Sequence, residues 1–270
     1  MLSRPSLFAV TCLAALLCAG AQPSPAADAV APAFLRVLTY NIHHGAGEDG
    51  KIDLDRIARV IRDSGADLVV LQEVDRGTRR SGKVDQAKSL ADRLKMHHAF
   101  GTAIRFEGGE YGNAVLSRWP LAGEKVEPLP NPGKKEARAA VVATADVPGV
   151  GPVGVVGTHL SHDSADSRAA QAAAVGELAV KLDAKLVVLA GDFNAPPADP
   201  TLRPLTERWH DPAAGAAKPV LTYPADKPKA RIDYVLIRKA DAAAWDATAR
   251  AVEEPVASDH RPVLVTLRRK

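Results

Sequence analysis

Polar side chains of the kinds that handle phosphate and metal ions stand at the ends of six predicted strands. In chain order they are Asn41, Glu73, His159, Asp192 with Asn194, Asp233, and Asp259 with His260. One carboxylate or amide at a strand end is ordinary and serves as a turn or cap. Six strand ends of this kind predict a site, because ligand sites in layered α/β folds form where strand ends and loops converge. Carboxylates, amides and imidazoles together form an oxygen-rich site that suits Mg²⁺ or Mn²⁺ better than structural zinc.

The elements that must position these side chains are strands joined by helical crossovers and by short turns. Apolar β-branched runs predict strands, and apolar residues at helical spacing predict helices. The predicted strands are 34–42, 67–74, 98–106, 114–117, 139–145, 153–158, 185–190, 232–237 and 262–267, and the predicted helices are 54–62, 86–94 and 165–182. Asp53 is the expected N-cap of the first helix. No linker interrupts this pattern, which indicates one α/β domain with mixed sheets.

Composition and charge exclude several classes of protein. Of the 270 residues, 46% are hydrophobic and 25% are charged, which is typical of a soluble globular protein and not of a disordered or collagen-like chain. Aromatic residues make up only 4%, so the core must consist largely of Ala, Val and Leu. The formal net charge of +3 is too small to indicate a nucleic-acid binder by itself.

The first 21 residues are interpreted as a signal peptide. Arg4 precedes an apolar run over 7–17, and the small residues Ala19, Gly20 and Ala21 form the expected cleavage site. The apolar run is shorter than the ~20 residues that a membrane-spanning helix needs. We therefore expect a secreted or periplasmic protein of bacterial origin.

Both cysteines, Cys12 and Cys18, lie in this signal. The exported chain would have no cysteine and therefore no disulfide. A lipoprotein signal at Cys18 is disfavoured, because bulky Leu17 precedes it. Residues 22–32 are rich in Ala and Pro and are predicted to form a flexible lead-in to a domain over 33–270.

Seven short sequence blocks occur in one order along the chain. They are Thr39-Tyr40-Asn41, Leu71-Gln72-Glu73-Val74, Gly112-Asn113-Ala114-Val115-Leu116-Ser117-Arg118, Thr158-His159-Leu160, Gly191-Asp192-Phe193-Asn194, Arg231-Ile232-Asp233-Tyr234 and Ser258-Asp259-His260. Over 34–267 the chain thereby resembles the endonuclease/exonuclease/phosphatase superfamily. The resemblance implies a four-layer α/β sandwich, in which two packed mixed β-sheets are flanked by helices. It also implies metal-dependent hydrolysis of phosphoesters such as DNA, RNA, sphingomyelin or inositol phosphates.

The resemblance assigns a metal site to three of these residues. Glu73 would be the principal Mg²⁺ ligand, and Asn41 and Asp259 would complete or support the site. Glu73 follows a run of four apolar residues, where an unpaired carboxylate would be costly.

The resemblance assigns catalytic roles to five others. Asp192 would orient and deprotonate the attacking water, and Asn194 would hydrogen-bond the same phosphate, although an Asx turn is the plain structural alternative for this pair. His260 would contact a phosphoryl oxygen, and Asp233 would hold the tautomer of His260. An acidic partner of this kind favours the charged imidazole and raises its pKa. His159 would bind the phosphate from the other side.

Substrate-binding roles are expected more weakly for Arg138, Asn113 and Tyr111. Arg138 is interpreted either as a bidentate phosphate ligand or as a solvated strand residue. For Asp233 a surface salt bridge with Arg231 is the structural alternative. Four further histidines are interpreted as surface or packing residues: His43, His44, His97 and His98.

Two other interpretations remain. Residues 158–163 resemble the THxHxDH loop of metallo-β-lactamase-like zinc hydrolases, but the histidine spacing differs by one residue and the second Asp-His step is missing. Alternatively, the chain is a binding module of the same fold that has lost catalytic turnover.

The substrate is not determined by the sequence. A nuclease is the leading specific hypothesis, and a sphingomyelin or inositol-phosphate phosphohydrolase is the second. The modest charge and few aromatic residues do not indicate a nucleic-acid groove. We expect a monomer that binds a phosphoester and is not inserted in a membrane after signal cleavage.

Overall fold

The computed structural model describes Met1–Leu2 and Phe34–Lys270. Apart from its first two residues, the predicted signal peptide lies outside the described residues, as does the lead-in over 22–32. Among the described residues, no helix combines the length and the apolar character needed to cross a bilayer.

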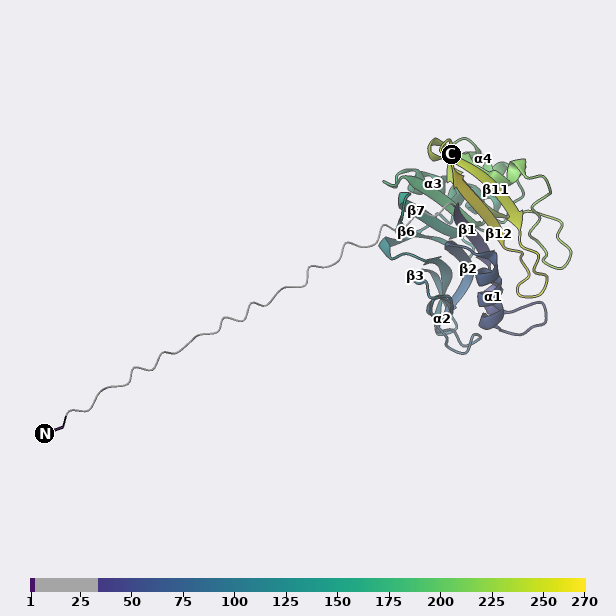
Figure 1. Cartoon of the computed structure of the whole chain (residues 1–270). Coiled ribbons are helices and arrows are strands. Elements are labelled where there is room, and N and C mark those ends of the chain that lie inside the picture. The colour runs from purple at the N-terminus through teal and green to yellow at the C-terminus, as the bar shows by residue number, and fades with distance from the viewer. Residues whose placement is uncertain (3–33) are drawn as a thin grey trace.

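Two mixed β-sheets of six strands each form the centre of the molecule (Figure 1). The first sheet has the order β11 (Trp245–Ala251), β12 (Val263–Arg269), β1 (Phe34–Asn41), β2 (Leu68–Arg76), β4 (Gly109–Ser117), β3 (His97–Phe106). The second has the order β5 (Leu121–Pro128), β6 (Ala139–Val147), β7 (Gly151–His159), β8 (Leu186–Asp192), β10 (Asp233–Arg238), β9 (Trp209–His210). The predicted four-layer sandwich of mixed sheets is confirmed.

Helical crossovers create the parallel pairs at the middle of each sheet. Helix α1 (Leu54–Ser64) connects parallel β1 and β2, and α3 (Ala165–Val180) connects parallel β7 and β8. In Figure 1, the purple β1 also runs beside the yellow β12, its antiparallel partner from the other end of the chain. The remaining helices are η1 (His43–Gly45), α2 (Gln86–Leu94), η2 (Pro200–Leu202), α4 (Arg203–Thr206), η3 (Pro212–Gly215) and α5 (Lys239–Ala242).

Asp53 and Gly65 cap the two ends of helix α1. The side chain of Asp53 accepts a hydrogen bond from the backbone N–H of Arg56, as predicted for an N-cap. Gly65 ends the helix in the left-handed region at φ 71°, which costs glycine little because it has no Cβ. The buried face carries Ile57 and Ile61, which pack against the first sheet.

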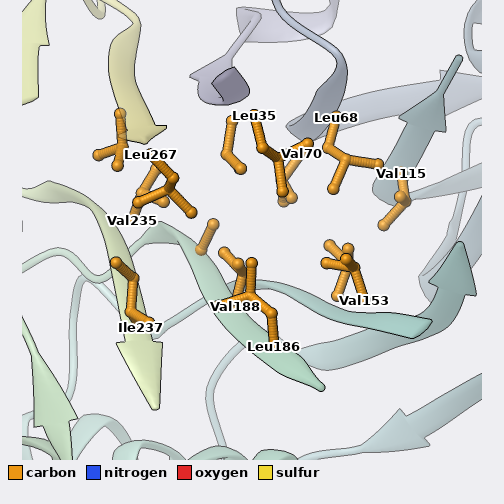
Figure 2. Packing of buried hydrophobic residues seen from close by; sticks show 14 of the residues in the cluster. Leu35, Leu68, Val70, Val115, Val153, Leu186, Val188, Val235, Ile237 and Leu267 are labelled. Atoms are coloured by element: carbon orange, nitrogen blue, oxygen red, sulfur yellow. The ribbon is translucent and has the colours of Figure 1, made fainter. Parts of the chain in front are cut away.

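The central core lies between the two sheets. Figure 2 shows Val70 of the first sheet facing Val153 and Val188 of the second. Separate apolar clusters cover the outer faces, one beneath α1 and α2 and one beneath α3. Each sheet is therefore buried on both faces, which explains the long apolar runs of its central strands.

The central strands carry apolar side chains along most of their length and polar side chains at one end. Side chains alternate between the two faces of the sheet up to that end. Since alternate residues of a strand share a face, Asp192 points in the same direction as Val188, toward the space between the sheets. The same alternation places Asn41 of β1 and Asp233 of β10 on the inner faces of their sheets.

Strands β5, β9 and β11 were not predicted. β11 has the sequence WDATARA and β5 the sequence LAGEKVEP, both poor in the β-branched residues that favour strands. They form because β11 pairs with β12 and β5 pairs with β6 at sheet edges. β4 begins earlier than predicted, at Gly109, where two glycines weaken the strand pattern. A Cβ at Gly112 would lie 1.9 Å from the carbonyl oxygen of Gly101, so the close strand approach requires glycine there.

Candidate active site

A pocket of about 370 Å³ lies at the polar end of the sandwich. Its lining residues are Glu73, Tyr111, Glu136, Arg138, His159, His162, Asp192, Asn194, Tyr223, Ile232, Asp259 and His260. Most of the residues predicted from the sequence are in this set. Asn41 and Asp233 are not, because both are buried and reach lining residues through hydrogen bonds.

Three neighbouring strands bring His159, Asp192 and Asp233 together. In the parallel pairing of β7 and β8, His159 lies opposite Asp192. In the antiparallel pairing of β8 and β10, Asp192 lies opposite Asp233. The Nε2 atom of His159 is 3.4 Å from Oδ2 of Asp192. The adjacent ends of these three strands therefore hold an imidazole and two carboxylates in a row.

His260 reaches this row from the loop before β12. Its Nδ1 atom lies 2.9 Å from Oδ2 of Asp233, and its Nε2 atom lies 3.7 Å from Oδ2 of Asp192. Burial alone would lower the pKa of His260, but the charges of Asp233 and Asp192 outweigh it and raise the pKa to about 10. The ring is therefore positively charged near neutral pH and presents an N–H donor to the pocket.

Asp192 is a buried carboxylate with weakened acidity. Burial, and then the neighbouring charge of Asp233, raises its pKa to about 7. Its Oδ1 accepts a hydrogen bond of 2.8 Å from the backbone N–H of Asn194, which is an Asx turn. The Asx turn that was the structural alternative is therefore present. The side chains of Asp192 and Asn194 nevertheless both line the pocket.

Asn41 links the two sheets at the base of the pocket. Its Nδ2 donates hydrogen bonds of 3.1 Å to Oε1 of Glu73 and to Oδ2 of Asp192. Its Oδ1 accepts from the backbone N–H of His43, and its backbone carbonyl accepts from the hydroxyl of Ser258. In this arrangement Asn41 supports the two carboxylates, while its own amide oxygen is engaged with His43.

A β-bulge directs Glu73 toward Asn41. The pairing of β2 with β4 shifts between Leu71 and Val74, and Glu73 has the left-handed φ of 57°. Such a conformation costs a non-glycine residue about 1–2 kcal/mol. Strain of this kind is typical of functional sites, where the surroundings impose it.

The donor set fits a hard divalent cation. Glu73 and Asp259 both line the pocket, and carboxylate oxygens are the preferred ligands of Mg²⁺ and Mn²⁺. The side chain of Asp259 is 30% exposed, and its Oδ1 lies 3.2 Å from the hydroxyl oxygen of Ser258. The pocket lining holds more carboxylates (Glu73, Glu136, Asp192 and Asp259) than cationic groups (Arg138 and His260), and a bound cation would offset the difference.

Arg138 is buried in the pocket and is not the solvated strand residue of the second interpretation. It is 4% exposed, and its NH1 lies 2.8 Å from Oε1 of Glu136. The guanidinium also lies 3.3 Å from Nδ1 of His159 and 3.4 Å from Nδ1 of His162. A positive group between these two histidines would repel a zinc ion, which counts against the metallo-β-lactamase-like interpretation.

The other expected substrate-binding residues are placed differently. Tyr111 lines the pocket, and burial together with Glu73 raises the pKa of its hydroxyl well above the usual value, so it is a neutral phenol. Asn113 does not line the pocket. Its Nδ2 donates to the carbonyl oxygen of Ala139, which ties the two sheets together.

The predicted alternative of an Asp233–Arg231 salt bridge is wrong. Arg231 pairs through both terminal nitrogens with Asp211, at 3.0 and 2.6 Å, while Asp233 is committed to His260.

Four lining residues were not predicted as site residues: Glu136, His162, Tyr223 and Ile232. Glu136 lies two residues from Arg138, His162 lies two residues after the block that ends at Leu160, and Ile232 lies in the block with Asp233, so proximity to recognised residues was an available signal. Tyr223 had no such signal, and its ring centroid is 4.9 Å from that of His260.

The sequence and the fold of this chain are similar to those of known proteins. The profile of the Endonuclease/Exonuclease/phosphatase family matches residues 38–260, which include all the predicted site residues. A curated Escherichia coli K12 protein, YbhP, is 28% identical over 239 residues, covering 84% of this chain and 94% of YbhP.

Solved structures with the same fold include three informative ones. An endonuclease/exonuclease/phosphatase from Beutenbergia cavernae is 31% identical, with a TM-score of 0.68, and the match covers 87% of this chain and 72% of that one. A mannosyl-6-phosphatase of Bacteroides thetaiotaomicron is 17% identical, with a TM-score of 0.68 and coverage of 86% and 99%. Truncated TDP2 of Caenorhabditis elegans is 18% identical, with a TM-score of 0.68 and coverage of 87% and 98%. The last two similarities show the fold alone.

Proposed function

Because the chain belongs to the endonuclease/exonuclease/phosphatase family, we propose that its pocket hydrolyses a phosphoester with Mg²⁺ or Mn²⁺ as cofactor. The observation that carries this proposal is the convergence of Asp192, Asp233 and His260. One ligand-capable atom of each lies within 4.8 Å of the other two, and all three side chains are buried. A base, a charged donor and the residue that orients the donor are thereby assembled in one pocket.

Donor groups in the pocket would bind the phosphate. His260 offers its Nε2 proton and Arg138 its guanidinium, while Asn194 and His159, whose Nδ2 and Nε2 atoms lie 2.9 Å apart, line the same pocket. Because these groups are largely buried and already held in place, they stabilise charge that develops on the phosphoryl oxygens without reorganising.

Asp192 would accept the proton of the attacking water. A carboxylate with a pKa of about 7 is a better base near neutral pH than an ordinary aspartate, whose pKa is 3.8. Asn41 and the backbone N–H of Asn194 hold the carboxylate in position.

Glu73 would hold the cation, with Asp259 as a second ligand and Asn41 as support. When bound, a divalent cation supplies positive charge that offsets the charge of the phosphate and of the transition state.

The preferred substrate is a phosphodiester, with nucleic acid as one class and sphingomyelin or inositol phosphates as another. A small phosphomonoester is a second candidate, favoured by one observation. Among the residues that line the pocket in the described part of the chain, Arg138 is the sole Lys or Arg, which suits one phosphate better than an extended polyanion.

Hydrolysis by the purified full chain tests the proposal. With Mg²⁺ or Mn²⁺ we expect turnover of bis-p-nitrophenyl phosphate that EDTA abolishes, and p-nitrophenyl phosphate distinguishes a monoesterase from a diesterase. A panel of plasmid DNA, RNA, sphingomyelin, inositol phosphates and mannose 6-phosphate then identifies the substrate class. Protein that is inert across these metals and substrates would instead be a binding module of this fold.

Export is proposed from residues 1–21. Sequencing of the N-terminus of protein recovered from periplasm or medium checks this proposal. A chain that begins at Gln22 would support it, and an intact N-terminus in the cytoplasm would contradict it.

A further inference from the structure

Two consecutive histidines lie beside Glu73, outside the set of residues given roles above. They are His43 and His44, the first two residues of η1, which follows β1 after one intervening residue. One ligand-capable atom from each of His43, His44 and Glu73 lies within 4.8 Å of the other two. This is the spacing of side chains that can share one metal ion.

Each of these histidines has a buried nitrogen with no hydrogen-bond partner. The Nδ1 atoms of His43 and His44 are both inaccessible and unpaired among the described residues. Leaving a buried polar atom without a partner costs about 1–3 kcal/mol. The carboxylate of Asp259 lies near His43, with its Oδ1 4.0 Å from Nδ1 of the ring.

The backbone holds the two rings in a strained arrangement. His43 and His44 have φ angles of 44° and 45°, and Glu73 has 57°, so three non-glycine residues adopt the left-handed conformation around one point. The segment is anchored, because the N–H of His43 donates to Asn41 and the carbonyl of His44 accepts from Gln86. The donor atoms are therefore positioned before any cation binds.

We propose that His43 and His44 add nitrogen ligands to the Glu73 site, so that it binds Mn²⁺ and similar transition-metal ions in preference to Mg²⁺. Imidazole nitrogen suits transition metals, whereas Mg²⁺ prefers oxygen ligands and binds nitrogen weakly. The inference deepens the proposed function and rests on it, since it concerns the cofactor of the same pocket. It replaces the sequence-based interpretation of His43 and His44 as surface or packing residues.

Metal binding to the EDTA-treated full chain tests the proposal without measuring turnover. Calorimetric titration should give a dissociation constant for Mn²⁺ at least tenfold below that for Mg²⁺. His43→Asp and His44→Asp replace nitrogen donors by oxygen donors and should each reduce this ratio. His97→Asp is the matched control, because His97 is exposed and pairs with Ser117 at the opposite end of the first sheet. It should leave the ratio unchanged.

Pulsed electron paramagnetic resonance of the Mn²⁺-loaded wild type provides a second readout that needs no variant. Coupling to directly bound ¹⁴N is expected, and its absence would overturn the proposal even if the histidine variants fail to fold. An unchanged ratio of affinities in both folded variants would also overturn it. Protein that shows nitrogen coupling but hydrolyses no phosphoester contradicts the proposed function alone, whereas a Mg²⁺-driven hydrolase without nitrogen coupling contradicts this inference alone.

Discussion

The Nδ1 atom of His260 lies 2.9 Å from Oδ2 of Asp233, and both side chains are buried. The carboxylate keeps the Nδ1 proton in place, so that the opposite ring nitrogen faces Asp192 and the pocket. The pair thereby decides both the orientation and the charge of the imidazole.

Asp233→Asn should shift the pH profile of the enzyme. Asp233 and Asp192 together raise the pKa of His260 from 6.5 to about 10 despite its burial. Without Asp233, His260 should lose its proton at lower pH, and kcat/KM should fall on the alkaline side of neutrality by about 100-fold. A pH–rate profile of the variant and of wild type measures this shift.

The same pair has a defined effect on stability. Since the pKa of His260 is raised in the folded state, its contribution is fully present below pH 6.5 and is lost as the pH rises through about 10. The destabilisation of Asp233→Asn, about 2 kcal/mol at pH 6, should therefore shrink toward pH 10 in denaturant titrations. Asp211→Asn, which removes the partner of Arg231, is the control and should not move the pH–rate profile.

Asp192→Asn should lower kcat by about 10³-fold or more, because it removes the base while keeping the shape of the side chain. Burial and Asp233 raise the pKa of Asp192 from 3.8 to about 7. A carboxyl group with a raised pKa destabilises the fold as the pH rises from 3.8 through 7. In EDTA, the melting temperature of the variant should therefore equal or exceed that of wild type at pH 8. A variant that melts lower than wild type at pH 8 and not at pH 5 would contradict the assignment.

Arg138→Gln should weaken phosphate binding more than it slows turnover. The buried guanidinium lies beside His159 and His162 and has Glu136 as its ion-pair partner, and its positive charge in the pocket attracts phosphate. We expect KM, and the inhibition constant of inorganic phosphate, to rise about 10-fold, a loss of about 1.4 kcal/mol. Arg118→Gln is the matched control, because Arg118 is 53% exposed and pairs with Asp67 outside the pocket. An equal effect of both variants would count against a phosphate ligand at Arg138.

Gly157→Ala should destabilise the sandwich by about 2 kcal/mol. A Cβ at this position would lie 2.7 Å from Cγ1 of Val70 and 3.1 Å from Cγ1 of Val141, inside the contact between the two sheets. Gly215→Ala is the control, because a Cβ there meets nothing within 4 Å, and its effect should stay within about 0.5 kcal/mol. Denaturant titration measures the free energy of unfolding of both variants. Equal values would contradict the prediction, because the two sheets would then move apart at little cost to accept the added Cβ.

Features that depend only on residues close together in the sequence could be predicted from the sequence. Asp53 was correctly expected to cap a helix, and the apolar runs around Val70 and Val188 were correctly expected to be strands. The strands β5 and β11 were not predicted, because their residues have weak strand preference and the strands exist only through pairing with β6 and β12. Local preference is a poor guide where pairing with a distant segment supplies the hydrogen bonds.

At the site, the sequence identified the residue types but not all of their contacts. It placed Asp192 and His260 among the reactive residues because they belong to recognisable blocks. It did not predict that Asn113 would hold two sheets together, or that His43 and His44 would lie beside Glu73. The bulge that directs Glu73 depends on the pairing of β2 with β4, which no local pattern reveals.

From the sequence came the strands of the core and the chemical character of the pocket, because alternation and short motifs act over a few residues, while the sandwich arrangement was implied by the resemblance to a known family. The folded arrangement sets which polar strand ends meet, how far apart they lie and how their pKa values shift. Those properties depend on the packing of two sheets whose strands come from distant parts of the chain. Burial and neighbouring charge, which raise the pKa of Asp192, exist only after that packing is complete.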